Sequence, residues 1–283
     1  MNWGRAKTIL ILFFLLLNLC LGGILIYMNQ TEASLSDEVI RNTIQLLEQN
    51  NISFTEHSIV PKQKFPNQNV ILSTLKIPDE KSTELWLGKG YAELEKDSLS
   101  HHYVYVNGGK HLTIEKTRIH FTHDKTLVPL PLVTPKEIQS YLEERLKQFG
   151  FQQNEYYFKK LWFENGLYQG IIAPYADDVR VIGVELTVAA DSDSIVYLSG
   201  NWFTDNGKEL LADDGMLDIT AVMANLIYLD KEPPIVLEEI YCGAYVSKEY
   251  LNNKTVTAVP AYVFVARDGR EFYFDARSGE RIG

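Results

Sequence analysis

An unbroken apolar run near the amino terminus constrains this chain more than any other feature. Residues 9–28 contain no charged side chain and a single strongly polar one, Asn18. At about 1.5 Å per residue in a helix, this run spans roughly 30 Å, the thickness of the hydrocarbon core of a bilayer. The sequence therefore predicts a transmembrane helix at 9–28, preceded by a short cytoplasmic tail at 1–8.

A cleaved signal peptide is the alternative interpretation of this run. Signal peptides have a shorter apolar core of about 7–15 residues, which favours a retained anchor. Thr31-Glu32-Ala33 nevertheless resembles a cleavage site and keeps the alternative open. Arg5 and Lys7 precede the run and acidic residues follow it, so the positive-inside rule predicts a cytoplasmic amino terminus. Everything after about residue 29 is then expected outside the cell membrane.

One face of the predicted helix is a candidate for contact with a partner. Phe14 lies one turn before Asn18 and Gly22 one turn after it, with Leu25 continuing toward the outer side. Glycine permits close approach between helices, and asparagine can hydrogen-bond across them. The alternative is that an isolated Asn is simply tolerated in an anchor. Phe14, Asn18, Gly22 and Leu25 are therefore the predicted contact residues.

The charge balance excludes several classes of partner for the outer region. The chain has 27 basic and 37 acidic residues, and two of the basic ones, Arg5 and Lys7, lie in 1–28. The remainder thus carries 25 basic against 37 acidic side chains, a net charge of −12. Such a surface does not favour nucleic acid or anionic lipid headgroups.

The outer region is predicted to be two α+β domains, each with a helix followed by an antiparallel sheet. Ser36 can cap a first helix, whereas the proline-rich strap at 128–135 marks a boundary between domains at 29–128 and 134–283. Thr134-Pro135-Lys136-Glu137 is a capping box that begins the next helix. A poorer helix is predicted at 82–96, strands at 52–59, 70–77, 111–121 and 235–246, and turns at Asn165-Gly166 and Asn206-Gly207.

Common catalytic signatures are absent from the sequence. It has no G-x-S-x-G, H-E-x-x-H, P-loop or C-x-x-C motif, so no catalytic, cofactor-binding or metal-binding residue is assigned and no enzyme is predicted. Histidines at 101, 102, 111, 120 and 123 lie in or beside predicted strands, where solvated side chains are favoured over a metal site. Acidic pairs at 177–178, 191–193 and 213–214 are interpreted as turn and surface acids.

Aromatic residues offer one further alternative, a groove for a sugar or peptide. Tyr156-Tyr157, Trp162, Tyr168 and Tyr175 could line such a groove, but packing on the sheet faces is favoured, because aromatic residues are common in strands. Cys242 is interpreted as a small buried apolar residue in a strand.

Both ends of the chain resemble the YycI (WalI) family. The opening run Met1-Asn2-Trp3-Gly4-Arg5-Ala6-Lys7-Thr8-Ile9 leads directly into a single span with Asn18 near its middle. Toward the end, the segments that carry the resemblance are Ile240-Tyr241-Cys242-Gly243-Ala244-Tyr245, Pro260-Ala261-Tyr262, Tyr273-Phe274-Asp275-Ala276 and Gly279-Glu280. The resemblance implies a C-terminal module similar to PepSY-type domains.

This resemblance also implies a function without catalysis. Members associate with a YycH-type membrane protein and with the sensor histidine kinase WalK (YycG), whose pathway controls cell-wall metabolism. The expectation is a membrane-anchored regulator that modulates the kinase through transmembrane and extracytoplasmic contacts. The alternative is a tethered extracytoplasmic binding module for a peptide or cell-wall fragment.

Overall fold

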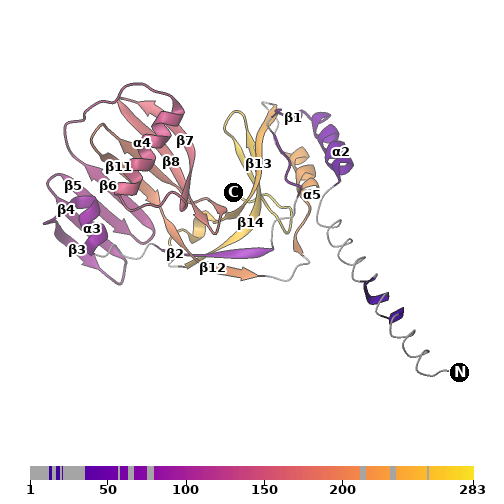
Figure 1. The fold of residues 1–283 in the computed structure, drawn as a ribbon, viewed down its shortest axis with the longest axis horizontal. Helices are drawn as coiled ribbons and strands as arrows, with labels where there is room; N and C mark the ends of the chain where they lie inside the picture. Colours follow the sequence, from indigo (N-terminus) through magenta and orange to yellow (C-terminus); the bar gives the residue numbers. More distant parts are fainter. Residues whose placement is uncertain are drawn as a thin grey trace.

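Strands make up most of the folded chain and helices pack against them, which confirms the mixed α+β class predicted from the sequence (Figure 1). The computed structural model describes residues 13, 14, 17–19, 21, 36–56, 58–62, 67–74, 80–210, 215–229, 234–253 and 255–283. The described strands belong to one hydrogen-bonded network, within which two groups of elements have cores of their own.

Residues 80–202 form the first group, the central unit. Its strands run in the order β3-β4-β5-β6-β11-β10-β8, with β7 added on β8, and its two helices pack on this sheet. Tyr103, Phe121, Leu142 and Leu198 are fully buried in the shared core. The elements are α3 (Glu80–Leu87), β3 (Ala92–Asp97), β4 (His102–Asn107), β5 (Lys110–Glu115), β6 (Arg118–His123), α4 (Pro135–Gln148), β7 (Tyr156–Glu164), β8 (Leu167–Ala176), β10 (Leu186–Ala190) and β11 (Ile195–Asn201).

The second group, the flanking unit, combines residues 36–74 with residues 203–283. Its strand order is β12-β2-β14-β13, with β1 paired on β13 and β15 on β14. Leu47, Val222 and Phe264 join its helices to its strands in one core. The elements are α2 (Asp37–Glu48), β1 (Ile52–Phe54), β2 (Gln68–Thr74), β12 (Phe203–Leu210), α5 (Ile219–Ala224), β13 (Ile235–Tyr245), β14 (Thr255–Ala266) and β15 (Glu271–Asp275), with 3-10 turns at Asn225–Tyr228 and Lys248–Tyr250.

A short strand, β9 (Val179–Ile182), connects the two units. It pairs antiparallel with the end of β8, where Tyr175 lies opposite Arg180. On its other side it pairs parallel with β13, where Val181 lies opposite Ala244. The central and flanking units therefore meet along β9, between the two halves of the molecule in Figure 1.

Local signals in the sequence placed several elements correctly. The Ser36 side chain accepts a hydrogen bond from the Val39 backbone N–H at the start of α2. Thr134 and Glu137 form the reciprocal capping box that begins α4. Asn165 and Gly166 have φ of 54° and 77°, as a tight turn between β7 and β8 requires. Residues 124–134 have no regular structure, as Pro129 and Pro131 predict.

Several predicted elements were wrong in extent. The strand predicted at 52–59 covers only Ile52–Phe54. The helix predicted at 82–96 ends at Leu87, because Gly88 and Gly90 have positive φ and turn the chain into β3. The strand predicted at 111–121 is two strands, β5 and β6, separated by a turn in which Lys116 has φ of 55°. Gly207 lies within β12 at an irregularity in its pairing with β2 instead of in a hairpin turn.

The boundary predicted at 128–134 does not separate the sheets. From the segment 29–128, β1 and β2 pair with β13 and β14 of the flanking unit, whereas β6 pairs with β11. The observed units divide near residues 74–80 and 202–203. The alternation of apolar residues specifies which face of a strand is buried but does not specify its partner strand. No local signal therefore indicates that segments on both sides of the central unit in sequence combine into the flanking unit.

Among the described residues, no helix is both long and apolar enough to cross a membrane. Most of the span predicted at 9–28 lies outside the described residues. The described positions within it, all helical, are Phe13, Phe14, Leu17, Asn18, Leu19 and Leu21.

Candidate functional site

A lysine released from regular pairing lies at the centre of a polar cluster between the two units. In β7 the register passes from Phe158 opposite Ile172 to Lys160 opposite Ile171, which leaves Lys159 as the extra residue of a β-bulge. A bulge turns its side chain away from the regular alternation and is a frequent device beside functional sites. Lys159 is thereby directed toward the flanking unit.

Two carboxylates from different units bind the Lys159 ammonium. Its Nζ lies 2.6 Å from Glu185 Oε1 and 3.0 Å from Glu271 Oε2, and the lysine side chain is 15% exposed. The Tyr273 hydroxyl donates a hydrogen bond to Glu271. Burial opposes the charge of Lys159, but its bonds to Glu185 and Glu271 outweigh this cost and raise the pKa of the lysine. The cluster is thus an ionic link between β7 and β15.

An arginine on β9 reinforces the same junction. The Arg180 guanidinium lies 5.2 Å from the ring centre of Tyr157 and 4.5 Å from that of Tyr241, and it donates a hydrogen bond of 2.6 Å to Glu239. Stacking between two aromatic faces adds cation–π attraction to the ion pair. Burial raises the pKa of Tyr157 and also raises that of Tyr241 to about 12, so both phenols stay neutral at pH 7.

Two glycines allow the strands of this junction to approach so closely. A Cβ on Gly243 of β13 would lie 2.7 Å from the Arg180 backbone oxygen. Gly183, just after β9, has φ of +86°, and a Cβ there would lie 2.4 Å from the Val246 backbone oxygen. The sequence therefore needs glycine at both positions to bring β9 against β13.

A cavity of about 390 Å³ lies beside the Lys159 cluster. Both units contribute to its walls, and the Tyr245 and Tyr273 rings lie next to each other with centres 5.5 Å apart. The lining residues are Gly183, Glu185, Asn201, Tyr245, Lys248, Tyr273 and Gly283. Charged, amide, phenolic and backbone groups converge here, which suits a small polar ligand.

We expect that Lys159→Met lowers the free energy of unfolding by about 1–3 kcal/mol, because Glu185 and Glu271 would face each other without a cation. Solvent screens part of this effect, since Glu185 is 40% exposed. Urea denaturation measures the change. The control is Lys160→Met, its exposed neighbour in β7, for which about 0–1 kcal/mol is expected. Equal losses from the two substitutions would contradict a structural role for the cluster.

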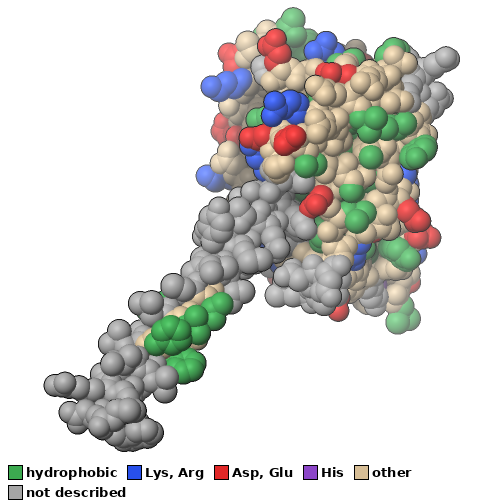
Figure 2. Space-filling model, turned by 90° about the vertical axis from the view of Figure 1, so that its right-hand side faces the viewer, with side chains coloured by type: hydrophobic (Ala, Val, Ile, Leu, Met, Phe, Trp, Pro, Cys, Tyr) green, Lys and Arg blue, Asp and Glu red, His purple; other side chains and the backbone are tan. Residues whose placement is uncertain are grey.

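The structure describes only two of the predicted contact and topology residues. Phe14 and Asn18 lie one turn apart on the same helical segment, and both are exposed. Figure 2 shows hydrophobic side chains along this segment, outside the folded body. The exposed fractions are 60% for Phe13, 53% for Phe14, 41% for Leu17, 67% for Leu19 and 49% for Leu21. Arg5, Lys7, Gly22 and Leu25 lie outside the described residues.

The histidines lie at separate points on the sheet of the central unit. His102 Nε2 is 3.1 Å from Glu95, and His120 Nδ1 is 3.2 Å from the Ser199 hydroxyl. His123 lies opposite Lys110 across the β5–β6 pair. In the described part of the chain, no group of three His, Cys, Asp or Glu side chains is placed to hold a metal ion.

The predicted aromatic groove is divided between two faces of one sheet. Tyr156 and Tyr168 are buried in the core beneath α4. Tyr157 and Tyr175 instead contact each other as tilted rings with centres 5.1 Å apart, and Tyr157 contacts Arg180 at the junction. The groove interpretation therefore fails for this set of aromatic residues as a whole.

Cys242 packs against the flanking core in β13, where burial raises the pKa of its thiol to about 12.

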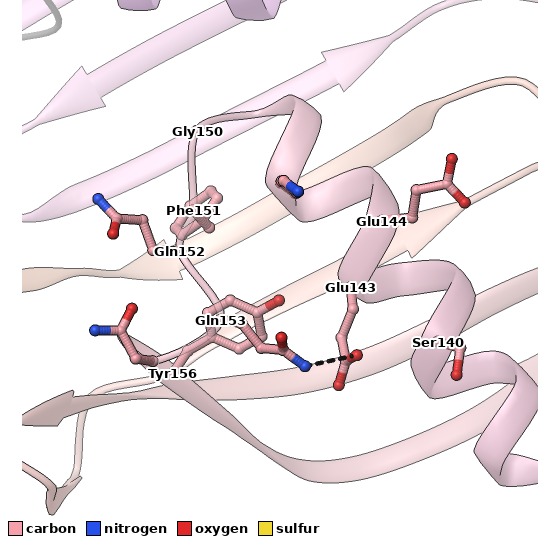
Figure 3. Close-up of a pocket in the computed structure, with 10 residues that line it drawn as sticks. Ser140, Glu143, Glu144, Gly150, Phe151, Gln152, Gln153 and Tyr156 are labelled. Atoms are coloured by element: carbon pink, nitrogen blue, oxygen red, sulfur yellow. Dashed lines mark hydrogen bonds between the residues drawn. The ribbon is translucent and has the colours of Figure 1, made fainter.

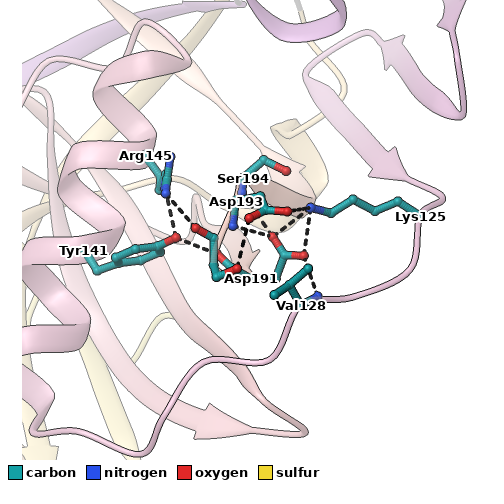
Figure 4. Close-up of polar contacts among 8 residues, drawn as sticks. Lys125, Val128, Tyr141, Arg145, Asp191, Asp193 and Ser194 are labelled. Carbon is teal, nitrogen blue, oxygen red and sulfur yellow. Dashed lines mark hydrogen bonds and ion pairs between the residues drawn. The ribbon is translucent and has the colours of Figure 1, made fainter.

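Asp191, interpreted from the sequence as a surface acid, is completely buried. Its carboxylate binds Lys125 at 2.8 Å and accepts backbone N–H bonds from Val128, Asp193 and Ser194 at 3.0–3.1 Å (Figure 4). The Tyr141 hydroxyl of α4 donates to the Asp191 backbone oxygen at 2.6 Å. This cluster ties the strap, the turn before β11 and α4 together through the Asp191 carboxylate and backbone, although the buried Ser194 hydroxyl makes no hydrogen bond to a described residue.

A second, larger cavity of about 610 Å³ lies at the end of α4 (Figure 3). Polar side chains of α4 and the following loop line it, and Gln153 donates a hydrogen bond of 3.1 Å to Glu143 across it. The Tyr156 hydroxyl also lies there. Its lining comes from the central unit alone, so this cavity lacks the position between units that distinguishes the one beside Lys159.

Sequence reasoning missed the residues of the junction. Lys159, Glu185 and Glu271 are far apart along the chain, and their types are ordinary for strand surfaces. One local signal was available: Tyr157-Phe158-Lys159-Lys160-Leu161 breaks the apolar alternation of a strand by one residue, as a bulge does.

Comparison with known proteins identifies no family. No protein-family model and no curated protein matches this chain. An uncharacterized protein from Eubacterium rectale is similar in structure, with a TM-score of 0.49 and 12% identity over 82% of this chain and 90% of that one. The C-terminal domain of YpeB from Bacillus megaterium has a TM-score of 0.45 and 8% identity over 73% of this chain and 96% of that domain. Similarity at this level carries no argument about function.

Proposed function

We propose that this protein is a membrane-anchored regulator without catalytic activity, which acts through protein–protein contacts. The observation that carries the proposal is the helical segment around Phe14 and Asn18, whose apolar side chains project from the folded body. Exposed apolar side chains of this kind require lipid or a partner helix around them. The charges of Arg5 and Lys7 support a cytoplasmic amino terminus, which places both α+β units outside the cell membrane.

The partners are proposed from the resemblance of the chain ends to the YycI family. They are a YycH-type membrane protein and a WalK-type sensor histidine kinase that responds to the cell wall. On the same basis, the segment containing β13, β14 and β15 is a PepSY-like module. A helix contact can shift a kinase only by its difference in affinity for the two signalling states, and about 1.4 kcal/mol changes their ratio tenfold.

Asn18→Leu is expected to weaken association with the kinase roughly 3- to 20-fold, since a hydrogen bond between membrane helices contributes about 0.6–1.7 kcal/mol. Purification of the intact protein in mild detergent, followed by quantification of the co-purified kinase, measures the effect. Leu16→Ala is the matched control, because residue 16 is about 200° around a helix from residue 18. Undiminished recovery of the kinase with the Asn18→Leu variant would show that Asn18 is not part of the contact. A deletion of Trp3–Tyr27 tests the whole helix, and this variant should no longer recover the kinase.

A second proposed function is capture of a small extracytoplasmic ligand by the tethered body. The cavity between the two units favours it, because its walls come from both and present polar groups of either charge. A variant that lacks residues 1–30 distinguishes the two proposals. Ligand capture should survive this deletion, whereas control of a kinase through the helix should not.

A further inference from the structure

The cavity beside Lys159 has dimensions that limit what it can hold. Its volume of about 390 Å³ corresponds to roughly a dozen water molecules at about 30 Å³ each, near the lower end of ligand pockets. Glu185 and Asn201 line it from the central unit, and Tyr245, Lys248 and Tyr273 line it from the flanking unit. An occupant of the size of an amino acid or dipeptide would contact both units at once.

Several polar groups of this cavity have no partner in the described part of the chain. The Tyr245 side chain is only 8% exposed, yet its hydroxyl makes no hydrogen bond to a described residue. The hydroxyl remains accessible to water in the cavity, where it can donate a hydrogen bond to a ligand. The Asn201 amide nitrogen and the Lys248 ammonium likewise make no hydrogen bond or ion pair with the described residues, although the Asn201 amide oxygen accepts one from Thr117.

The charges on the two walls differ in sign. On the central wall, Glu185 uses Oε1 to bind Lys159, which leaves its other carboxylate oxygen for an incoming cation. From the flanking unit, Lys248 supplies a cation and Tyr245 a neutral donor, and Asn201 of the central unit adds a second neutral donor for an anion. Charge-assisted hydrogen bonds are about twice as strong as neutral ones, so this pattern favours a ligand with an ammonium and a carboxylate.

We infer that this cavity binds a free amino acid or short peptide whose carboxylate contacts Lys248, Tyr245 and Asn201 while its ammonium contacts Glu185. The inference deepens the second proposed function, ligand capture, and does not depend on the helix contact. A bound ligand adds a second link between the units beside the Lys159–Glu271 pair. Occupancy would therefore stabilise the arrangement of the two units seen in the structure.

Calorimetric titration of the full-length protein in detergent with dialanine tests the inference. Saturable binding is expected at millimolar concentrations or below. N-acetyl-dialanine and dialanine amide should each bind at least about tenfold more weakly, because each lacks one of the two charges. Absence of saturable binding by dialanine, or equal binding of the blocked peptides, would overturn the inference. Preferential binding of N-acetylglucosamine, a neutral sugar, would overturn it too.

Substitutions locate the binding on the walls of this cavity. Lys248→Met should weaken the binding of dialanine about tenfold. It should leave the weak binding of dialanine amide unchanged, because the substitution and the amidation of the ligand remove the same contact. Tyr245→Phe, which keeps the ring but removes the hydroxyl, should weaken the binding of dialanine several-fold. Lys147→Met, the same change in the cavity at the end of α4, should have no effect. A loss with Lys147→Met equal to that with Lys248→Met would place the binding elsewhere and overturn the assignment.

The two proposed functions fail independently in these measurements. The Asn18→Leu variant should bind dialanine with the affinity of the unmodified protein, and the Lys248→Met variant should still co-purify with the kinase. Loss of both properties in either variant would indicate unfolding, which circular dichroism of the same samples detects. With folding confirmed, unchanged dialanine affinity in Lys248→Met would reject the ligand site and leave the helix contact untouched.

Discussion

Asp191→Ala is expected to lower the free energy of unfolding by about 3–5 kcal/mol, because it removes the fully buried anion at the centre of its cluster. Three backbone N–H groups, from Val128, Asp193 and Ser194, would lose their acceptor. Lys125, which is 18% exposed, would lose its closest ion-pair partner. A buried donor left without an acceptor costs more than the net gain of a typical hydrogen bond, so these losses together make a large effect.

Urea denaturation of the unmodified protein and of the Asp191→Ala variant, followed by tryptophan fluorescence, measures this difference in the free energy of unfolding. Asp193→Ala is the matched control, since Asp193 also pairs with Lys125, at 3.3 Å, but its side chain is 61% exposed. An exposed pair contributes about 0–1 kcal/mol. If the two alanine variants lost similar stability, the buried cluster would not be what fixes the strap against α4.

The same carboxylate makes stability depend on pH in a defined direction. Burial opposes ionisation of Asp191, but its bonds to Lys125 and to three backbone N–H groups outweigh this cost and hold its pKa below the ordinary value. Its contribution is therefore complete above the unfolded-state pKa of about 3.9 and disappears as the pH falls through the lower folded-state pKa. Between about pH 5 and strongly acidic conditions, the unmodified protein should lose more stability than Asp191→Ala, and parallel curves would exclude the mechanism.

Elements that begin or end at capping residues or turn residues could be predicted from the sequence. Ser36, Thr134 and Asn165-Gly166 each satisfy backbone groups within a few residues, so their effect does not depend on the rest of the fold. Gly88 and Gly90 carried a similar local signal for the end of α3. The prediction of a helix through residue 96 did not take this signal into account.

Pairings between distant segments could not be predicted in the same way. β1 and β13 lie about 180 residues apart in the chain, and a period-two pattern fits many possible partners. The candidate site depends entirely on such pairings, since Lys159, Glu185 and Glu271 meet only after β7 and β15 have been placed. Asp191 shows the same limit: its burial comes from the strap and α4, not from its own neighbours in sequence.

Gly183→Ala is expected to destabilise the junction between the units by about 2–5 kcal/mol, because two effects combine at this position. A left-handed backbone costs an L-residue about 1–2 kcal/mol, and the φ of Gly183 is +86°. Its new Cβ would also lie 2.4 Å from the Val246 backbone oxygen, so β9 and β13 would have to separate, at a further cost of about 1–3 kcal/mol.

Gly269→Ala is the matched control for the second effect, because Gly269 has the same φ of +86° but no atom within 4 Å of the position that a Cβ would occupy. It should therefore cost only about 1–2 kcal/mol. Urea denaturation measures both losses, and hydrogen exchange places them: Gly183→Ala should speed exchange of the Val246 amide, which donates to the Ile182 oxygen at 2.9 Å. Faster exchange there marks separation of β9 from β13. Equal losses in the two variants, with the Val246 amide still protected, would show that the close approach at Gly183 does not hold the units together.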